Sequence, residues 1–419
     1  MKRTFTLITC AALGLGFVYA EPANDNRFHS LEKKKDADKV FEENAPDDLK
    51  EAVPKFAVFG IPGKFYIGIG GSVKVTAGVD AGDPIENANE FITADISPVA
   101  PGNHTKFNLS AMQSNLYLNF VGLPGSDNQI GAFINMNFLR NYVPVVQAAY
   151  LQWRGIKAGY AYSVFSDQGA TPPTIDYEGP NAATAIPVPT LNYTYHFGRH
   201  KEWSASAGLE LSQLSQTNCA RSRTVNQAAP DIPIALQYRW NNASDWVRLS
   251  AIMRNMNYFN GVADRNIDIV GWGISLSGTA EIVPNLRAYW TGTYGHGIAS
   301  LIQDLSGGNM DLTPIGDQNR LKATKTWGAY GALQYNFTPD VYLSACYSHV
   351  RNYADPWDGG DVLTYPEAYK YAQYVSGSLF WNVNSYVTTG LEYIYGRRVN
   401  FDRSQSHDNR MQAMIQLSF

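Results

Sequence analysis

The chain has 419 residues and a formal net charge of −4, and only 17% of its residues are charged, against the roughly 25% usual for soluble proteins. This near-neutral balance excludes a nucleic-acid binder that works through a basic surface, and three cysteines are too few for a disulfide scaffold. Uncharged polar residues, Tyr and Gly replace the missing charge, a mixture that favours half-buried strands and turns over helices.

The chain begins with the layout of a secretory signal peptide. Lys2 and Arg3 precede an apolar run that ends at Val18, and the small residue Ala20 closes it. We expect cleavage after this alanine, which makes residues 1–20 the signal peptide. No later stretch reaches the ~18 consecutive apolar residues of a transmembrane helix.

Residues 21–60 form a charged N-terminal segment. From Arg27 to Pro54 this segment lacks glycine and has few aromatic residues, and its apolar positions do not sustain the heptads of a coiled coil. It is either a solvated helix or a mostly disordered periplasmic tether, and the composition favours the tether. The composition changes abruptly near Ile61.

From Lys64 to the last residue, apolar residues alternate with small or polar ones, which gives each strand one apolar and one wet face. The first alternating segment runs from Phe65 to Asp80. The others lie at about 106–121, 130–140, 145–153, 155–165, 189–197, 203–214, 232–240, 246–258, 267–281, 286–298, 326–338, 341–352, 369–381, 386–398 and 409–419. The total of sixteen is even, and the segments are close to or longer than the ~9–11 residues of a tilted membrane strand. The pattern predicts an all-β fold, a sixteen-stranded antiparallel transmembrane barrel over residues 61–419.

The connections between the segments alternate in length. Short turns lie near 198–202, 241–245, 283–285, 338–340 and 382–385, and mostly longer stretches lie near 81–105, 166–188, 215–231, 299–325 and 353–368. Outer-membrane barrels have short periplasmic turns and long external loops, whereas a soluble sandwich has no reason to sort its loops. We therefore expect the outer membrane of a Gram-negative bacterium, with its lipid as a partner.

Aromatic residues mark the ends of the predicted strands. Four pairs flank short turns and predict a periplasmic aromatic girdle: Phe197 and Trp203, Trp240 and Trp246, Phe337 and Tyr342, and Trp381 and Tyr386. The last strand ends on Phe419, a terminal aromatic that resembles the signal recognised by the outer-membrane barrel assembly machinery. This strand must pair with the first one, because an open sheet edge is not tolerated in lipid.

Three sequence segments around the long connection 166–188, which is the third loop, are the most distinctive in the chain. They lie at Gln147–Trp153 (QAAYLQW), Ala158–Asp167 (AGYAYSVFSD) and Pro173–Asn181 (PTIDYEGPN), with further ones after Ile61-Pro62-Gly63 and at Gln113–Leu116. In these residues the chain resembles the DcaP-like outer-membrane porin family, although Gln147 stands where the family is expected to have Arg. The resemblance implies a homotrimer of sixteen-stranded porins that pass small, often anionic solutes.

Basic residues predominate at the positions that the alternation turns inward. The basic ones are Lys74, Lys157, Arg239, Arg248, Arg254, Arg287, Lys370, Arg398 and Arg410, and the acidic ones are Asp80, Glu210 and Glu392. Charge on a pore wall selects ions of the opposite sign, so the pattern predicts a pore-lining basic set that favours anions. Alternatively, these charges only hydrate the wall and pair with acids of the loops.

The resemblance also implies that the third loop, 166–188, folds inward and narrows the pore. Pro172 and Pro173 stiffen its backbone. We expect Asp167, Asp176 and Glu178 to form an acidic side of this constriction, opposite Arg239, Arg248 and Arg254. The same acids could instead only tie the loop to the wall.

Motifs for enzymatic chemistry are weak. The seven histidines are dispersed, without an HExxH motif or a Gly-x-Ser-x-Gly elbow, and only His349, beside Ser348, merits inspection. Asp355, Asp358 and Asp361 share one loop but lack the bidentate terminal Glu of a calcium loop. We expect no catalytic residue, metal or cofactor.

The sequence therefore predicts a porin for passive diffusion of small hydrophilic, preferentially anionic solutes such as carboxylates. An outer-membrane hydrolase would need a Ser/His cluster at the barrel rim. A structural or adhesive barrel would have a lumen sealed by side chains.

Overall fold

The computed structural model describes residues 40–41, 57–61, 64–97, 104–212, 222–315, 320–354 and 368–419. The expected signal peptide, most of the segment 21–60 and the loop with Asp355, Asp358 and Asp361 lie outside these ranges. Within them, no helix combines the length and the apolarity that a membrane crossing needs.

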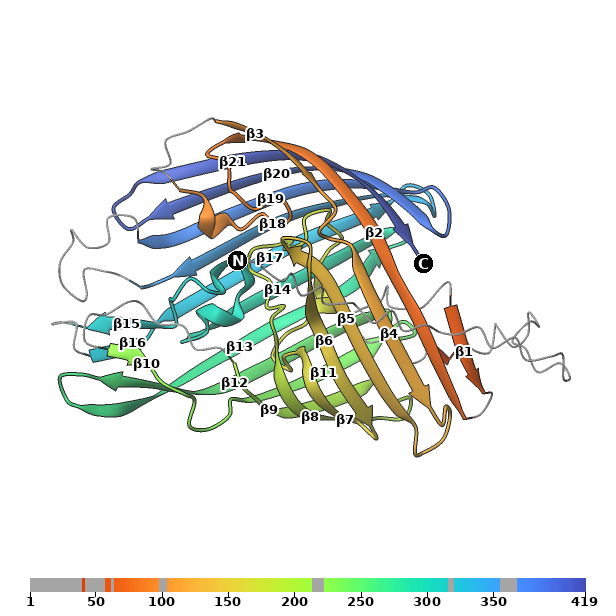
Figure 1. Ribbon diagram of the computed structural model, residues 1–419, viewed down its shortest axis with the longest axis horizontal. Helices are drawn as coiled ribbons and strands as arrows, with labels where there is room; N and C mark the ends of the chain where they lie inside the picture. Colours follow the sequence, from red (N-terminus) through yellow and green to blue (C-terminus); the bar gives the residue numbers. More distant parts are fainter. Residues whose placement is uncertain are drawn as a thin grey trace, which may run out of the picture.

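Antiparallel strands close into the predicted sixteen-stranded barrel, which is confirmed (Figure 1). β3 and β4 both pair with β2 and together make one interrupted wall strand. The wall consists of β2 (Phe65–Gly82), β3 (Thr105–Ser110), β4 (Asn115–Gly122), β5 (Ile130–Arg140), β6 (Val143–Trp153), β7 (Ile156–Tyr162), β8 (Pro187–Phe197), β9 (Trp203–Glu210), β11 (Ile232–Trp240), β12 (Asp245–Asn260), β13 (Arg265–Val283), β14 (Leu286–His296), β17 (Lys325–Asn336), β18 (Val341–Asn352), β19 (Tyr369–Asn382), β20 (Val387–Asn400) and β21 (Gln405–Ser418).

Side chains alternate between lipid and lumen along these strands. On β2, Val73 and Val79 point outward and are 48% and 41% exposed, whereas Thr76 and Asp80 are buried on the inner face. The outward face is apolar because charge is costly against lipid. This alternation explains why the sequence pattern located the strands so closely.

Turn chemistry fixes the short connections at one end of the barrel. Asn241 and Asn242 have φ angles of 50° and 53°, a left-handed conformation that Asn tolerates and that tight hairpins need. Long connections lie at the other end, although 141–142, 261–264 and 401–404 at that end are short. The terminal Phe419 lies at the short-turn end and exchanges both backbone hydrogen bonds with Gly71.

Two of the eight residues expected in the aromatic girdle lie inside the barrel instead. Trp381 and Tyr386 are 53% and 48% exposed, as a girdle requires. Trp246, however, is buried and donates to Asp167, and Tyr342 stacks on the buried ring of Phe380. The prediction was wrong for Trp246 and Tyr342 because each lies on the lumen side of its strand.

Strand pairing begins slightly before the predicted barrel boundary. β1 (Ala57–Ile61) pairs with the first residues of β2, just beyond the point where β21 ends. Phe41 is buried against Tyr66 and Val121, so the N-terminal segment contacts the inner wall. Smaller elements are β10 (Ser222–Thr224), β15 (Leu312–Ile315), β16 (Arg320–Ala323) and the 3-10 helices η1 (Thr93–Asp95), η2 (Gln168–Ala170), η3 (Ala299–Leu301) and η4 (Gln303–Leu305).

A buried ion pair crosses the seam between the first and last wall strands. Asp80 and Arg410 are register partners, and their side chains bond at 2.6 and 3.0 Å while almost fully buried. Arg410→Met leaves the Asp80 carboxylate without its cationic partner, and such a change costs about 3–5 kcal/mol. We expect a lower urea midpoint of unfolding in detergent, with Asp80→Asn/Arg410→Met recovering part of the loss. An unchanged midpoint, equal to that of the exposed control Arg403→Met, would contradict this role.

Candidate functional site in the lumen

Three connections from the long-loop end fold into the barrel. We name them loop A (83–97), loop B (163–186) and loop C (297–311). Phe91 of loop A donates its N–H to Asp176 of loop B at 2.9 Å, and Gln303 of loop C donates to the carbonyl of Ala183 at 2.9 Å. Thr93 of loop A donates its hydroxyl to Asp304 of loop C at 2.7 Å. The three loops therefore form one assembly, seen as thin coils between the walls in Figure 1.

Carboxylates on the wall bind the backbone of loop B. Glu392 on β20 accepts the N–H groups of Ile175 and Asp176, both at 2.8 Å. Glu210 on β9 accepts the N–H of Val164 at 2.8 Å. Irregular backbone in a lumen has no strand partner, so these carboxylates satisfy groups that would otherwise be costly to bury.

Cations on the wall bind loop carbonyls in the same way. Lys74 donates to the carbonyl of Ile175 at 2.8 Å, and Arg248 donates to that of Val164 at 2.7 Å. Arg398 donates to Ala94 of loop A at 2.5 Å. A carbonyl oxygen carries no net charge, so each of these bonds positions a cation without adding a negative charge beside it.

Three other predicted pore-lining arginines form ion pairs. Arg254 was expected opposite the acids of loop B, but it bonds Asp231 at 3.0 Å and Asp311 at 3.2 Å. Arg287 bonds Asp245 at 2.9 Å beside a short turn. Arg410 pairs with Asp80. Because Arg254 and Arg410 are only 1% exposed, neither reaches the open lumen.

The remaining predicted cations are half-buried. Arg239 lies on β11 two residues from the buried Gln237. The ammonium of Lys157 lies 4.8 Å from the ring centre of Tyr150. Lys370 lies 5.9 Å from the ring of Phe401.

Two acids of loop B meet a third from loop C, which the sequence did not predict, and we call this set the acidic junction (Asp176, Glu178 and Asp304). Burial and the charge of Glu392 raise the pKa of Asp176 to about 7. Burial raises the pKa of Asp304 to about 6, and burial beside Asp304 raises the pKa of Glu178 well above its usual value. The acidic junction therefore keeps part of its protons near neutral pH.

The third predicted acid of loop B binds the wall. Asp167 accepts the indole N–H of Trp246 at 3.1 Å and the hydroxyl of Ser277 at 2.5 Å. The interpretation that Asp167 ties loop B to the wall is therefore supported by direct contacts with β12 and β13.

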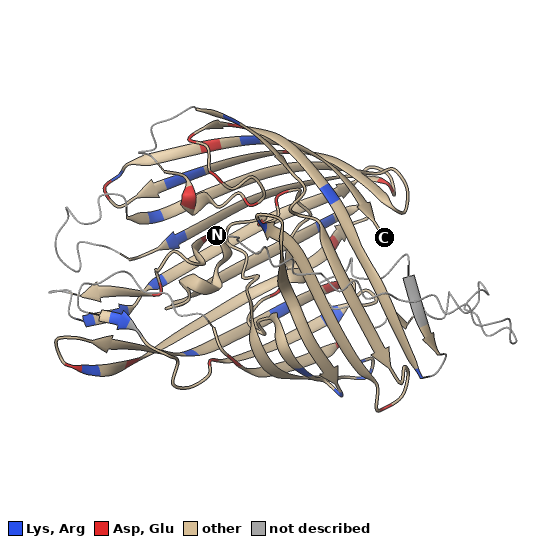
Figure 2. Ribbon diagram, in the orientation of Figure 1, with Lys and Arg blue, Asp and Glu red and all other residues tan. Residues whose placement is uncertain are grey.

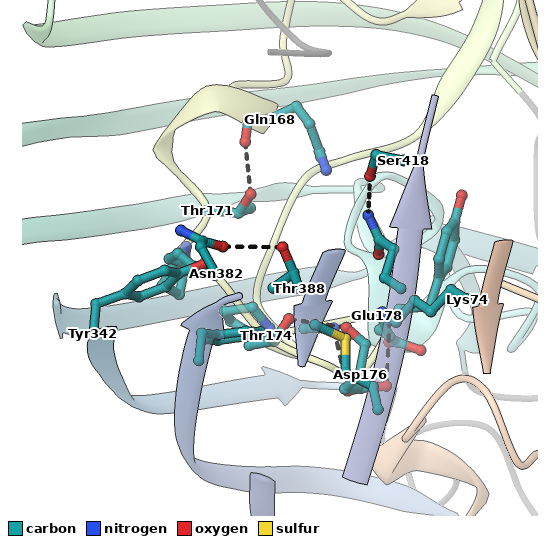
Figure 3. Close-up of a pocket in the computed structure, with 18 of the residues that line it drawn as sticks. Lys74, Gln168, Thr171, Thr174, Asp176, Glu178, Tyr342, Asn382, Thr388 and Ser418 are labelled. Atoms are coloured by element: carbon teal, nitrogen blue, oxygen red, sulfur yellow. Dashed lines mark hydrogen bonds between the residues drawn. The ribbon is translucent and has the colours of Figure 1, made fainter. Parts of the chain in front are cut away.

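A cavity of about 930 Å³ lies between loop B and the inner faces of β18 to β21 (Figure 3). Its side chains are mostly uncharged and polar, including Thr388, Asn382 and Gln416, with Lys74 at one side. Asp340 and Asn384 of the short turns also line it, so it opens toward the short-turn end. Its volume is in the range of small-molecule sites.

Sequence reasoning missed the insertion of loops A and C. Phe91 and Ile96 of loop A pack on Tyr374 and Ile394 of the inner wall. Loop C buries Ile298, Leu301, Ile302 and Leu305. The signal was present, because such apolar spacing is unexpected in a loop that stays in water.

The Ser/His pair does not form a catalytic contact. Ser348 donates to Asn181 at 2.6 Å inside the barrel, whereas the ring of His349 stacks on Trp327 and Tyr371. The two side chains point to opposite faces of β18. Among the described residues, no group of three or more His, Cys, Asp or Glu side chains is placed to hold a metal ion.

A family model described as Porin subfamily matches residues 124–413, more than half of the chain. The chain belongs to this porin family. The outer membrane channel DcaP of Acinetobacter baumannii has a similar structure, with 18% identity and a TM-score of 0.73 over 87% of this chain and all of that chain. The expected resemblance is thus confirmed for family and fold, and the Gram-negative outer membrane is its location.

More distant porins share the fold. Salmonella typhi OmpF, solved in complex with daunomycin, is 12% identical with a TM-score of 0.55 over 87% of this chain and 100% of that chain. Vibrio cholerae OmpT in a trimer form is 10% identical with a TM-score of 0.50 over 85% of this chain and 100% of that chain. No curated protein matches the chain.

The anchoring of loop B can be tested through Glu392. In Glu392→Gln one acceptor oxygen becomes an amide N–H₂, which opposes one of the two loop N–H groups. We expect higher and noisier single-channel conductance, because loop B is released from β20. The control Glu281→Gln changes an exposed acid near a short turn. Conductance identical to the wild-type protein in both variants would contradict the anchor.

Proposed function

We propose that this porin mediates passive diffusion of small hydrophilic solutes, with a preference for anions, through a lumen that loop B narrows. The attachment of loop B to opposite sides of the wall supports the constriction. Within loop B, the segment from Val164 to Ile175 is bound at its first residue by Arg248 of β12 and at its last residue by Lys74 of β2 and Glu392 of β20. A segment held at both ends inside the barrel reduces the free cross-section.

The balance of ionised groups supports the anion preference. Lys74, Arg239, Arg248 and Arg398 lie on the inner wall and are half-buried. Two of the acids that loop B adds, Asp176 and Glu178, are buried, and their raised pKa values reduce their negative charge. These inner-wall cations are the groups that would attract anions such as carboxylates.

The cavity beneath loop B supports a diffusion path over a sealed structural barrel. Its polar lining replaces hydration for a solute that passes between Thr388, Gln416 and Lys74. Figure 3 shows Thr388 and Lys74 beside this space. A barrel with a purely structural role would fill this volume with side chains.

Two partners complete the proposal. We infer a homotrimer, supported by the trimer form of the similar OmpT structure, and a single-chain mass in native mass spectrometry would contradict it.

We also infer that Phe419, the last residue of the closing strand, is recognised by the barrel assembly machinery. Phe419→Ala should then lower the yield of inserted barrel.

The anion preference is testable by reversal potentials in a potassium chloride gradient across planar bilayers. Arg239→Gln and Arg248→Gln remove inward cations, and we expect the chloride-to-potassium permeability ratio to fall roughly two- to threefold. Arg199→Gln, in an exposed short turn, should leave the ratio unchanged. Equal permeabilities in the wild-type protein, insensitive to both substitutions, would exclude an anion-selective pore.

Selectivity should also depend on pH. The raised pKa of Asp176, about 7, means that its carboxyl is neutral below that pH and negative above it. Glu392 and Arg410 act on this group electrostatically, and Tyr374 donates to it. Raising the pH from about 5 to about 8 therefore adds negative charge, and we expect anion preference to decrease. Asp176→Asn should flatten this dependence, and an anion preference that increases with pH would contradict the assignment.

A further inference from the structure

Aromatic rings form a row on the outer face of the barrel near the long-loop end. Trp327 of β17 stacks on His349 of β18 with ring centroids 5.0 Å apart. His349 stacks in turn on Tyr371 of β19 at 5.3 Å. The row extends to β13 and β14, where Trp272 stacks on His296 at 5.5 Å. Flat rings at this height are typical of the membrane–water interface.

The outward orientation of this row follows from its neighbours. Trp272 itself is 42% exposed, and Tyr347 and Val375, which share the faces of His349 and Tyr371, are 49% and 38% exposed. Ser348, between these positions, points into the lumen. The rings therefore face lipid and not the solute path.

Basic side chains lie within the same row, and we call them the rim cations (Lys325, Arg351 and Arg397). Lys325 and Arg351 lie 4.6 and 4.5 Å from the ring of Tyr353. The register pairs Arg351 with Trp327 and, on the other side, with Tyr371. Figure 2 shows Lys and Arg near the long-loop ends of this wall.

Strand pairing extends the basic row around the wall. Lys325 is opposite His296 of β14. Arg397 of β20 is opposite Gln373 on one side and His407 of β21 on the other. The basic residues therefore follow one level of the barrel across neighbouring strands and are not scattered along their length.

Acidic residues are absent from the same surface. Over the described strands β14 and β17 to β21, no outward position holds Asp or Glu, whereas the inner face of these strands holds Glu392 and Asp408. A basic side chain that faces lipid destabilises the barrel at the bilayer midplane, whereas at the edge of the bilayer it costs almost no free energy. Their position at the edge, on described strands that carry no outward acid, presents a positive band to the external leaflet.

We propose that the rim cations bind the phosphate groups of an anionic lipid of the external leaflet, whose acyl chains lie along the apolar outer wall below. Ammonium and guanidinium groups form charge-assisted hydrogen bonds with phosphate oxygens. The ring row supplies flat apolar contact beside the head group. The occupant is a phosphorylated lipid, because the site joins a positive band to an apolar wall. A free anion would contact the positive band but would leave the apolar wall unused.

The proposal is tested by native mass spectrometry of the full barrel in detergent, titrated with diphosphorylated lipid A and with its dephosphorylated form. We expect the wild-type protein to prefer the phosphorylated lipid roughly tenfold. Lys325→Gln/Arg351→Gln/Arg397→Gln should lose that preference, while Lys325→Arg/Arg351→Lys/Arg397→Lys keeps it. The matched control Arg199→Gln/Lys201→Gln removes exposed cations at the opposite end and should bind as the wild type does.

Other outcomes overturn the proposal. Equal binding of both lipids, or undiminished preference in the triple Gln variant, would remove the phosphate site. Loss of subunit association with lipid binding unchanged would assign the row to a contact between chains. Single-channel conductance of the triple Gln variant should equal that of the wild type, because the rim cations face away from the lumen. A folded barrel in that variant is verified by its heat-dependent gel shift.

Discussion

The inserted loops depend on one constraint: irregular backbone inside a barrel carries N–H and C=O groups that no strand can pair. The wall satisfies them with charged side chains of both signs. Glu392 accepts two loop N–H groups, and Lys74 donates to a carbonyl between them in the same turn of loop B. A charged wall is therefore needed to hold loop B inside the barrel, whatever solute passes.

This constraint makes two interpretations of the lumen charges compatible. The sequence left open whether these charges select anions or only support the wall and loops. Arg248 donates to the neutral carbonyl of Val164, so a cation of the wall serves as an anchor for loop B. The acids behave differently, since burial in the acidic junction raises the pKa of Asp176 and Asp304. The proposed anion preference thus uses the same residues as the structural support of loop B. The buried pairs of Arg254 and Arg410 belong to support alone.

The residues on the outer face of the wall are different from those that hold the loops inside the barrel. Ser348 and His349 are consecutive, yet one binds loop B and the other belongs to the ring row. Because the strand period is two, neighbouring residues serve the lumen and the lipid independently. The solute path and the proposed lipid site can therefore be changed separately.

The sequence was sufficient for the wall and insufficient for the loops. Alternation is a local signal, so Val73 and Val79 located their strand without knowledge of its neighbours. The partner of Asp304 is Thr93, 211 residues away, and no local pattern encodes that contact. Trp246 was misplaced for a related reason, since its position beside a turn suggested a girdle while its inward side chain binds loop B.

The central claim is that loop B, held by the charged wall, sets the size limit of the pore. Liposome swelling with sugars of graded mass tests it directly, in the wild-type protein and in a variant whose residues 168–181 are replaced by a short Gly-Ser linker. The account predicts that large sugars enter the variant liposomes much faster, while the smallest sugars enter both at similar rates. An identical size limit in the two proteins would contradict it.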